Sequence, residues 1–203
     1  MKILVLGNER SWNELIATSK DIQWQRANST IDFIEPNDAV AYFNLSTDAD
    51  SHDHSNIKKP VFINAVSKTL REINAGKNIV RINGWNGFIK RNSWEIAGDL
   101  NESHHIVVNT LQKKIIVTPD EPGFISARII SMIINEAFYA KGENISTEKE
   151  IDIAMKLGTN YPFGPFEWAQ EIGIKNIYDL LVSLSKNDVR YYPSLLLEQK
   201  AKN

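Results

Sequence analysis

The sequence between residues 158 and 167 reads GTNYPFGPFE, and it lies among segments whose apolar residues recur at helical spacing. Pro162 and Pro165 fix the backbone torsion φ, whereas Gly164 between them is free to adopt unusual torsions. The aromatic side chains of this stretch are therefore held as a fixed apolar surface, which is typical of a loop that packs against a neighbouring helix.

Helices are predicted on both sides of this loop. Thr147 and Glu150 have the spacing of a capping box, so we expect a helix to begin there and to end at Gly158. Two further helices are predicted over residues 166–172 and 177–184, and Ser194 is placed to cap a last one. Upstream, a helix with Pro122 in its first turn is predicted from apolar residues at helical spacing, which are Phe124, Ile125, Ile129, Ile133, Ile134 and Ala137.

The first 120 residues or so have a different pattern, in which short apolar runs alternate with polar segments. Such runs are typical of strands that are buried on both faces of a parallel sheet. They occur at residues 3–6, 22–24, 39–45, 60–66, 79–82, 105–108 and 114–117. Ser11 is placed to cap a helix after the first run. We therefore predict an α/β domain over residues 1–118 and an all-α domain over residues 119–203.

Composition excludes several classes of protein. The 203 residues include 23 Lys and Arg against 25 Asp and Glu, and this balance argues against a nucleic-acid binder. No apolar run approaches the ~20 residues that span a bilayer, and the first run is too short for the core of a signal peptide. The absence of cysteine excludes disulfides. We expect a cytoplasmic protein that binds neither nucleic acid nor membranes.

Several separate pieces of the C-terminal half together resemble a known family. They are Pro122-Gly123-Phe124-Ile125, Asn135-Glu136-Ala137, EIDIAM at residues 150–155, GTNYPFGPFE at residues 158–167 and RYYPS at residues 190–194. In order and spacing they are similar to the C-terminal helical domain of the 3-hydroxyacyl-CoA dehydrogenases, over residues 119–203. The alternative is an unrelated helical bundle in which proline, glycine and aromatic residues only punctuate the chain.

The resemblance implies a fold and partners. It implies a Rossmann-like, mostly parallel sheet over residues 1–118, here reduced and truncated, followed by the helical domain. It also implies a homodimer formed through the C-terminal helices, which in that family close over acyl-CoA.

Members of that family follow the first strand with G-x-G-x-x-G, where glycines let the pyrophosphate of NAD approach the backbone. Here residues 7–12 read GNERSW, so only the first glycine remains. Glu9 places a negative charge where the pyrophosphate would lie, and Trp12 is large where the third glycine would stand. The acidic residue expected about 20 residues further on is replaced by Gln25 and Arg26. The sequence therefore predicts no conventional NAD site and no bound cofactor.

The catalytic residues can be traced in the same way. The family uses a histidine in H-F-F-N-P as the base, and a glutamate further along orients it. Residues 83–87 read NGWNG, and the separation 95 − 83 = 12 equals the family spacing. The candidate site residues are Glu95, Asn86, Asn83 at the position of the histidine, and Ser67, which corresponds loosely to a substrate-contacting serine. The alternative is that Glu95 is a surface strand residue and that both asparagines only form turns.

Three functions remain open. We prefer a degenerate homologue that has lost the NAD site and the catalytic histidine and that binds acyl-CoA or a protein partner. The alternative is an active oxidoreductase that uses NAD to oxidise 3-hydroxyacyl-CoA to 3-ketoacyl-CoA in fatty acid metabolism. A third is a structural partner that pairs with a full-length relative.

Histidines suggest two further sites, which we discount. His52 and His54 flank Asp53, but no third ligand stands at a defined spacing, so we predict a solvated loop and no metal site. His104 and His105 could supply a replacement base, but we place them at the end of the run 105–108, in a strand.

Overall fold

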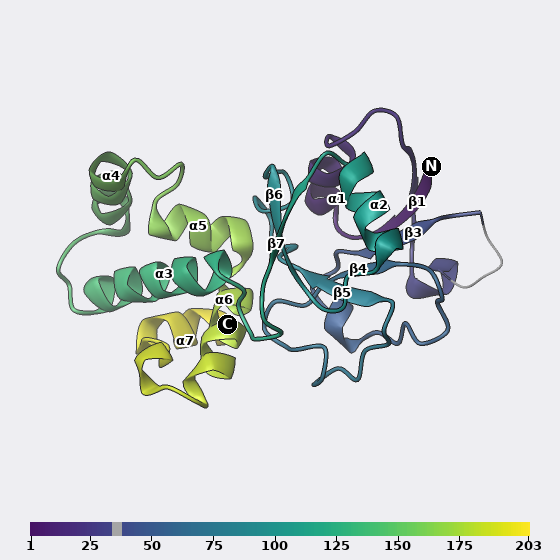
Figure 1. Ribbon diagram of the computed structural model, residues 1–203. Coiled ribbons are helices and arrows are strands. Elements are labelled where there is room, and N and C mark those ends of the chain that lie inside the picture. The colour runs from purple at the N-terminus through teal and green to yellow at the C-terminus, as the bar shows by residue number, and fades with distance from the viewer. Residues whose placement is uncertain (34–37) are drawn as a thin grey trace. The chain divides into compact units, whose positions relative to one another are not determined.

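The computed structural model describes residues 1–33 and 38–203, which form two compact units, Met1–Phe124 and Ile125–Asn203 (Figure 1). Unit 1 contains the sheet, and unit 2 is all helical. Within the described residues, no helix is both long enough and apolar enough to cross a bilayer.

Unit 1 is built on a sheet with the strand order β2-β1-β3-β4-β5-β6-β7. The strands are β1 Lys2–Leu6, β2 Gln23–Arg26, β3 Ala41–Asn44, β4 Val61–Asn64, β5 Ile79–Ile82, β6 Ser93–Ala97 and β7 Lys114–Val117. Strands β1 to β5 run parallel, β6 is antiparallel to β5, and β7 is parallel to β6. The strand order changes direction at β1, with β2 on one side and β3 on the other. In open α/β sheets, ligands bind at such a point, in the crevice at the carboxyl ends of the strands, which here are β1 and β3.

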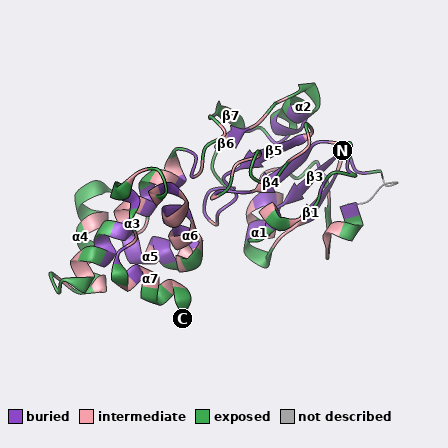
Figure 2. Ribbon diagram, turned by 90° about the horizontal axis from the view of Figure 1, so that it is seen from below, coloured by how far each residue is buried: buried purple, intermediate pink, exposed green. Residues whose placement is uncertain are grey.

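The two faces of the sheet are covered differently. Helices α1 Glu9–Ile16 and α2 Glu102–Thr110 cover one face, where Leu15 and Val107 join a core with Phe43 and Phe62. The other face lies under the crossovers from β3 to β4 and from β4 to β5, which contain one 3₁₀ turn, Ala49–Ser51, and no α-helix. Figure 2 shows the central strands β3, β4 and β5 buried between these layers. The second face is therefore covered by loops.

The described residues confirm most of the predicted strands. The runs at 79–82 and 114–117 are β5 and β7 with the predicted bounds. The prediction of a strand at 105–108 is wrong, because Asn101 and His104 form a capping box that starts α2. The prediction that Ser11 caps a helix is also wrong, since Asn8 caps α1 and accepts a hydrogen bond from the Ser11 N–H at 2.8 Å.

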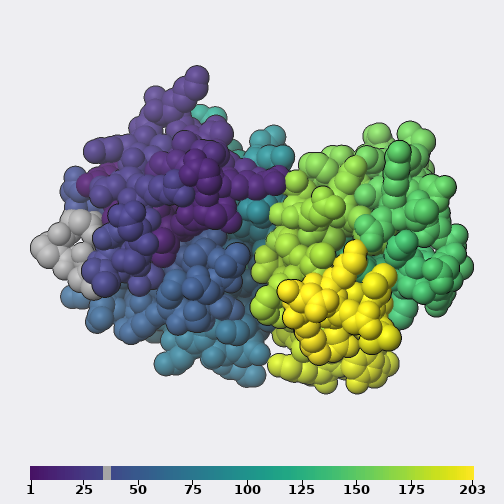
Figure 3. All heavy atoms as spheres, turned by 180° about the vertical axis from the view of Figure 1, so that it is seen from behind, coloured from purple at the N-terminus to yellow at the C-terminus, as the bar shows by residue number. Residues whose placement is uncertain are grey.

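Unit 2 contains α3 Ser126–Gly142, α4 Glu148–Thr159, α5 Pro165–Ile172, α6 Ile174–Ser185, a 3₁₀ turn at Val189–Tyr191 and α7 Leu195–Lys202. Helix α7 packs on α3 and α6, and Figure 3 shows it in yellow on the surface of unit 2.

The predicted caps of unit 2 are confirmed at Thr147 with Glu150 and at Ser194. The expected first turn at Pro122 is wrong, because Gly123 and Phe124 adopt positive φ values of 88° and 48° and the helix begins only at Ser126. Helix α4 also continues past Gly158 and ends where Asn160 turns left-handed.

Candidate functional site

The predicted site residues lie at the edge of the sheet where the parallel strands end. Strand β6 runs antiparallel to β5, and its register pairs Ile82 with Ile96. Asn83 is thereby brought beside Glu95, and its Nδ2 lies 3.4 Å from the Glu95 Oε2. Asn83 is buried and Glu95 is half-buried. The structure therefore brings together the two residues that the sequence analysis assigns to the positions of base and orienting carboxylate.

The other two candidates follow neighbouring strands at the same edge. Ser67 lies in the loop after β4, and Asn86 lies in the loop between β5 and β6; both are half-buried. An amide or a hydroxyl at these positions can form hydrogen bonds with a carbonyl group, but neither can act as a base near neutral pH.

The loop that carries Asn83 and Asn86 is held in place by two close contacts. A Cβ atom on Gly84 would lie 2.7 Å from the Cβ of Asn64, so only glycine fits there. The Gly87 N–H donates to the carboxylate of Glu14 at 2.8 and 3.0 Å. The sequence analysis missed Glu14, and no local signal could have found it, because it is separated from Gly87 by 73 residues.

Charged side chains occupy the tip of β1. Glu9 lies in the first turn of α1 and forms an ion pair with Arg26, which stands at the end of β2. The Arg26 Nη2 also lies 3.4 Å from the carbonyl of Gly7, and the guanidinium lies 5.7 Å from the centre of the Trp12 ring. The hydrogen bond from Arg26 lowers the pKa of Glu9, so this carboxylate stays charged.

The backbone donors at this tip are also partly used. The Asn8 side chain accepts from the N–H of Ser11, and a Cβ atom on Gly7 would lie 2.6 Å from the Ser11 Oγ. A helix N-terminus binds phosphate when its N–H groups are free and its first turn lacks negative charge. Here one donor is capped internally and Glu9 supplies a negative charge.

In unit 2, a buried asparagine joins two of the segments that carry the resemblance. Asn135 of α3 donates from Nδ2 to the Tyr192 carbonyl at 2.9 Å and accepts from the Ser194 N–H at 2.8 Å. It is 2% exposed, so loss of the amide would strand two buried backbone groups. Asn135 therefore holds the segment 190–194 against α3.

A buried carboxylate joins the next two segments. Asp152 of α4 accepts from the Phe166 N–H at 2.8 Å and from the Glu167 N–H at 3.2 Å, at the start of α5. Burial raises the pKa of Asp152, although the two backbone donors oppose this shift. Gly164 provides the space for this contact, because its Cβ would lie 2.4 Å from the Asp152 carboxyl carbon.

No group of three or more potential ligands drawn from His, Cys, Asp and Glu gathers to hold a metal ion in residues 1–33 and 38–203.

A family model described as the C-terminal domain of 3-hydroxyacyl-CoA dehydrogenase matches residues 123–203. The 3-hydroxyadipyl-CoA dehydrogenase of Escherichia coli (strain K12) is 41% identical over 91 residues, which cover 44% of this chain and 19% of that protein. The 3-hydroxybutyryl-CoA dehydrogenase of Bradyrhizobium diazoefficiens is 39% identical over 92 residues, which cover 44% of this chain and 31% of that protein. The matched segment thus spans 31% or less of the length of these relatives.

Solved structures extend the similarity to both units. The (S)-3-hydroxybutyryl-CoA dehydrogenase from Ralstonia eutropha superposes with a TM-score of 0.70 at 18% identity, over 98% of this chain and 92% of the other. FadB2 of M. tuberculosis gives a TM-score of 0.75 at 10% identity, over 98% and 93%. At these identities the likeness establishes the fold, and it confirms the Rossmann-like sheet followed by a helical domain. The chain is therefore similar to the 3-hydroxyacyl-CoA dehydrogenases in sequence over residues 123–203 and in fold over both units.

Proposed function

We propose that this chain is a family member that has lost NAD-dependent oxidation and that binds acyl-CoA or a protein partner. The observation that carries the proposal is the amide of Asn83 beside Glu95, at the position of the family's histidine. Oxidation of a 3-hydroxyl group needs a base that takes the hydroxyl proton as hydride leaves, and an amide cannot accept that proton near neutral pH. Loss of a general base alone costs about 10² to 10⁴ in rate.

The tip of β1 supports the same proposal, because its side chains do not fit the NAD that the resemblance implies. A dinucleotide would bring its pyrophosphate to the N-terminus of α1. Glu9 would repel the pyrophosphate, and release of Arg26 to bind it would break the ion pair with Glu9. The bulky ring of Trp12 stands where close packing requires glycine.

The remaining polar groups at the edge of the sheet are suited to binding. The amides of Asn83 and Asn86 and the hydroxyl of Ser67 can donate hydrogen bonds to a thioester or ketone oxygen. Glu95 holds the Asn83 amide through Nδ2, which orients it. The site can therefore recognise an acyl group without moving a proton.

A thermal-shift titration with acetoacetyl-CoA tests the binding part of the proposal. A ligand that binds only the native state stabilises it by about 2.7 kcal/mol at 100 times its dissociation constant. We expect a saturable rise in the unfolding temperature with acetoacetyl-CoA and none with NADH. No response to acetoacetyl-CoA at saturating concentration would leave a protein partner as the ligand, and a saturable response to NADH would contradict the loss of the cofactor site.

An active dehydrogenase is the second candidate, and one observation favours it. The residues at the positions of base and carboxylate still lie side by side, Asn83 directly after β5 and Glu95 on β6.

The variant Asn83→His separates these candidates. If only the base were missing, the new imidazole would lie beside Glu95 and turnover of 3-hydroxybutyryl-CoA with NAD would rise by about 10²-fold or more. We expect no measurable rise, because the tip of β1 is unchanged. Asn83→Gln, which adds bulk but no base, is the matched control.

We further propose a homodimer formed through unit 2. Its helices expose large apolar side chains, with Ile129 at 55%, Ile153 at 43% and Leu157 at 83% exposure. Ile153 and Leu157 stand four residues apart on α4 and so share one helix face, and exposed apolar side chains that gather in this way are typical of a protein interface. Light scattering at micromolar concentration should give twice the monomer mass, and Leu157→Lys should reduce it. A monomeric mass for the unmodified chain would contradict the homodimer and favour pairing with a full-length relative.

A further inference from the structure

A buried amide at the end of β3 faces two imidazole rings. Asn44 is fully buried, and its Nδ2 lies 3.0 Å from the His52 Nδ1 and 3.1 Å from the His54 Nε2. Its Oδ1 accepts hydrogen bonds from the Ser46 N–H at 3.2 Å and from the Ser46 hydroxyl at 2.6 Å. A flipped amide would turn its NH₂ group against the Ser46 N–H, so this backbone donor fixes the orientation of the amide.

The amide orientation determines the protonation of both rings. Each of the two amide hydrogens points at a ring nitrogen, so the His52 Nδ1 and the His54 Nε2 must both carry a lone pair. The His52 Nε2 lies 3.5 Å from the carboxylate of Asp48, and the second nitrogen of His54 is satisfied by the backbone of His52. His52 is therefore the Nε2–H tautomer, and His54 is the Nδ1–H tautomer.

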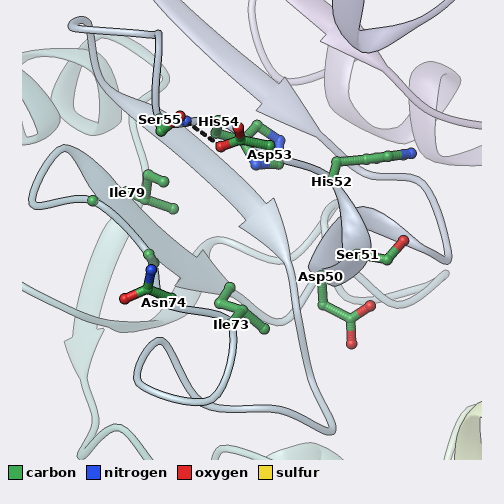
Figure 4. Close-up of a pocket in the computed structure, with 11 residues that line it drawn as sticks. Asp50, Ser51, His52, Asp53, His54, Ser55, Ile73, Asn74 and Ile79 are labelled. Atoms are coloured by element: carbon green, nitrogen blue, oxygen red, sulfur yellow. Dashed lines mark hydrogen bonds between the residues drawn. The ribbon is translucent and has the colours of Figure 1, made fainter.

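Residues 52–54 form a loop in which Asp53 is exposed, as predicted, but the prediction of a solvated loop is wrong for His54. His54 is only 4% exposed, and it lines a hollow of about 390 Å³ between the two helix-free crossovers (Figure 4). In the close-up, Asp53 and His54 lie on one side of the hollow, with Ile73, Asn74 and Ile79 on the other.

The charges around His54 come almost entirely from its own crossover. Burial lowers the pKa of His54, the neighbouring His52 lowers it further, and Asp53 opposes this shift. Asp50 is engaged by Lys68, 3.3 Å away, from the crossover between β4 and β5. The other residues that this second crossover places at the hollow, Ile73 to Gly76, carry no charge.

We propose that Asn44, His52 and His54 form a proton-sensitive clamp that holds the crossover from β3 to β4 on the sheet and releases it on acidification. Protonation of either ring would place an N–H group against the buried amide NH₂ of Asn44, which costs the hydrogen bond and leaves two donors facing each other. The amide cannot turn to meet the new donor without losing the bond from Ser46.

The clamp acts on the edge of the sheet that carries the candidate site. The Ser46 carbonyl accepts from the Asn64 Nδ2 at 3.4 Å, and Asn64 in turn packs on Gly84 in the loop that holds Asn83. Release of the crossover therefore loosens the end of β4 and widens the hollow. This inference does not depend on the proposed acyl-CoA binding.

The direction of the pH effect follows from linkage. The folded state disfavours protonated His54, so below the ordinary histidine pKa of about 6.5 the unfolded chain binds more protons than the folded one. The contribution of the clamp to stability is present above about pH 6.5, and it is lost as the pH falls through the lowered pKa of His54.

Nitrogen-detected NMR of the four histidines tests the clamp directly. We expect the Nε2–H tautomer for His52 and the Nδ1–H tautomer for His54 at neutral pH. As the pH falls, hydrogen exchange of residues 45–59, corrected for the intrinsic effect of pH, should accelerate at least 10-fold. The midpoint of this acceleration should equal the midpoint of the His54 titration. His105→Gln removes an exposed histidine outside the clamp and should leave this response unchanged.

Asn44→Asp provides the decisive variant, because a carboxylate accepts hydrogen bonds from both protonated rings. An opposite charge at this distance should raise the midpoint of His54 by about 1 to 3 pH units, and the acid release of residues 45–59 should disappear. Opposite tautomers in the unmodified chain, or exchange that stays constant through the titration of His54, would overturn the clamp even if the variant fails to fold.

Discussion

Replacing Gly164 by alanine should lower the stability of unit 2 by about 2 to 4 kcal/mol. The added Cβ would lie 2.4 Å from the Cβ and Cγ atoms of Asp152, which belong to the base of a buried side chain and cannot swing away. To admit the methyl group, Asp152 must leave the N–H groups of Phe166 and Glu167. The start of α5 then loses its cap, and the contact between α4 and α5 is broken.

Gly158→Ala is the matched control, six residues earlier in the stretch GTNYPFGPFE. No atom lies within 4 Å of the position of its Cβ, and the residue is inside α4. Alanine there should stabilise the helix by up to about 1 kcal/mol. Urea unfolding followed by circular dichroism, with hydrogen exchange to localise the change to α4 and α5, measures both variants. Equal effects of the two substitutions would contradict the role assigned to Gly164.

Replacing Arg81 by methionine should cost unit 1 about 3 to 5 kcal/mol. Arg81 lies on β5 with no exposed surface, and its Nε donates to the Asp120 Oδ1 at 2.8 Å. Its two terminal nitrogens donate to the carbonyls of Ala65, Lys68 and Glu121 at 2.7, 2.7 and 3.0 Å. Methionine fills similar space but has no donor, so three carbonyls lose the hydrogen bonds from Arg81, and the Asp120 carboxylate keeps the Leu70 N–H but loses its charged partner.

Two further variants show whether the loss comes from the buried hydrogen bonds. Arg81→Lys keeps the charge but cannot reproduce the planar fork of donors, so its cost should lie between that of methionine and zero. Arg71→Met removes an exposed arginine and should change stability by less than about 0.5 kcal/mol. Urea denaturation measures the free energy of unfolding of each variant. A loss below about 1 kcal/mol for Arg81→Met would contradict the role assigned to the hydrogen bonds of Arg81.

How much of the fold could be predicted depended on how local each signal is. The strands at 79–82 and 114–117 and the cap at Thr147 are set by neighbouring residues, and these predictions are confirmed. The prediction for residues 105–108 is wrong because a run of four residues, three of them apolar, cannot distinguish a strand from a buried helix turn. The cap at Asn101, which starts the helix, lies outside the run. Strand β6 was not among the predicted strands.

The same limit applies to the candidate site. The spacing of 12 residues only aligns Asn83 and Glu95 with the family motif. The structure adds that the two residues lie side by side, because β5 and β6 form an antiparallel pair joined by one loop. The contacts of Glu14 with Gly87 and of Arg81 with Asp120 join residues 73 and 39 positions apart. The pairing of Asn44 with His52 and His54 depends on a backbone turn that composition alone does not specify.

The most direct test of the proposed function is the formation of NADH from NAD and 3-hydroxybutyryl-CoA by the purified chain, followed by absorbance. Enzymes of this kind typically turn over at about 1 to 10³ per second. With Asn83 at the position of the base and Glu9 at the tip of β1, we expect no NADH above the rate without protein. Turnover within the ordinary range, lost in Glu95→Gln, would contradict the proposed loss of dehydrogenase chemistry.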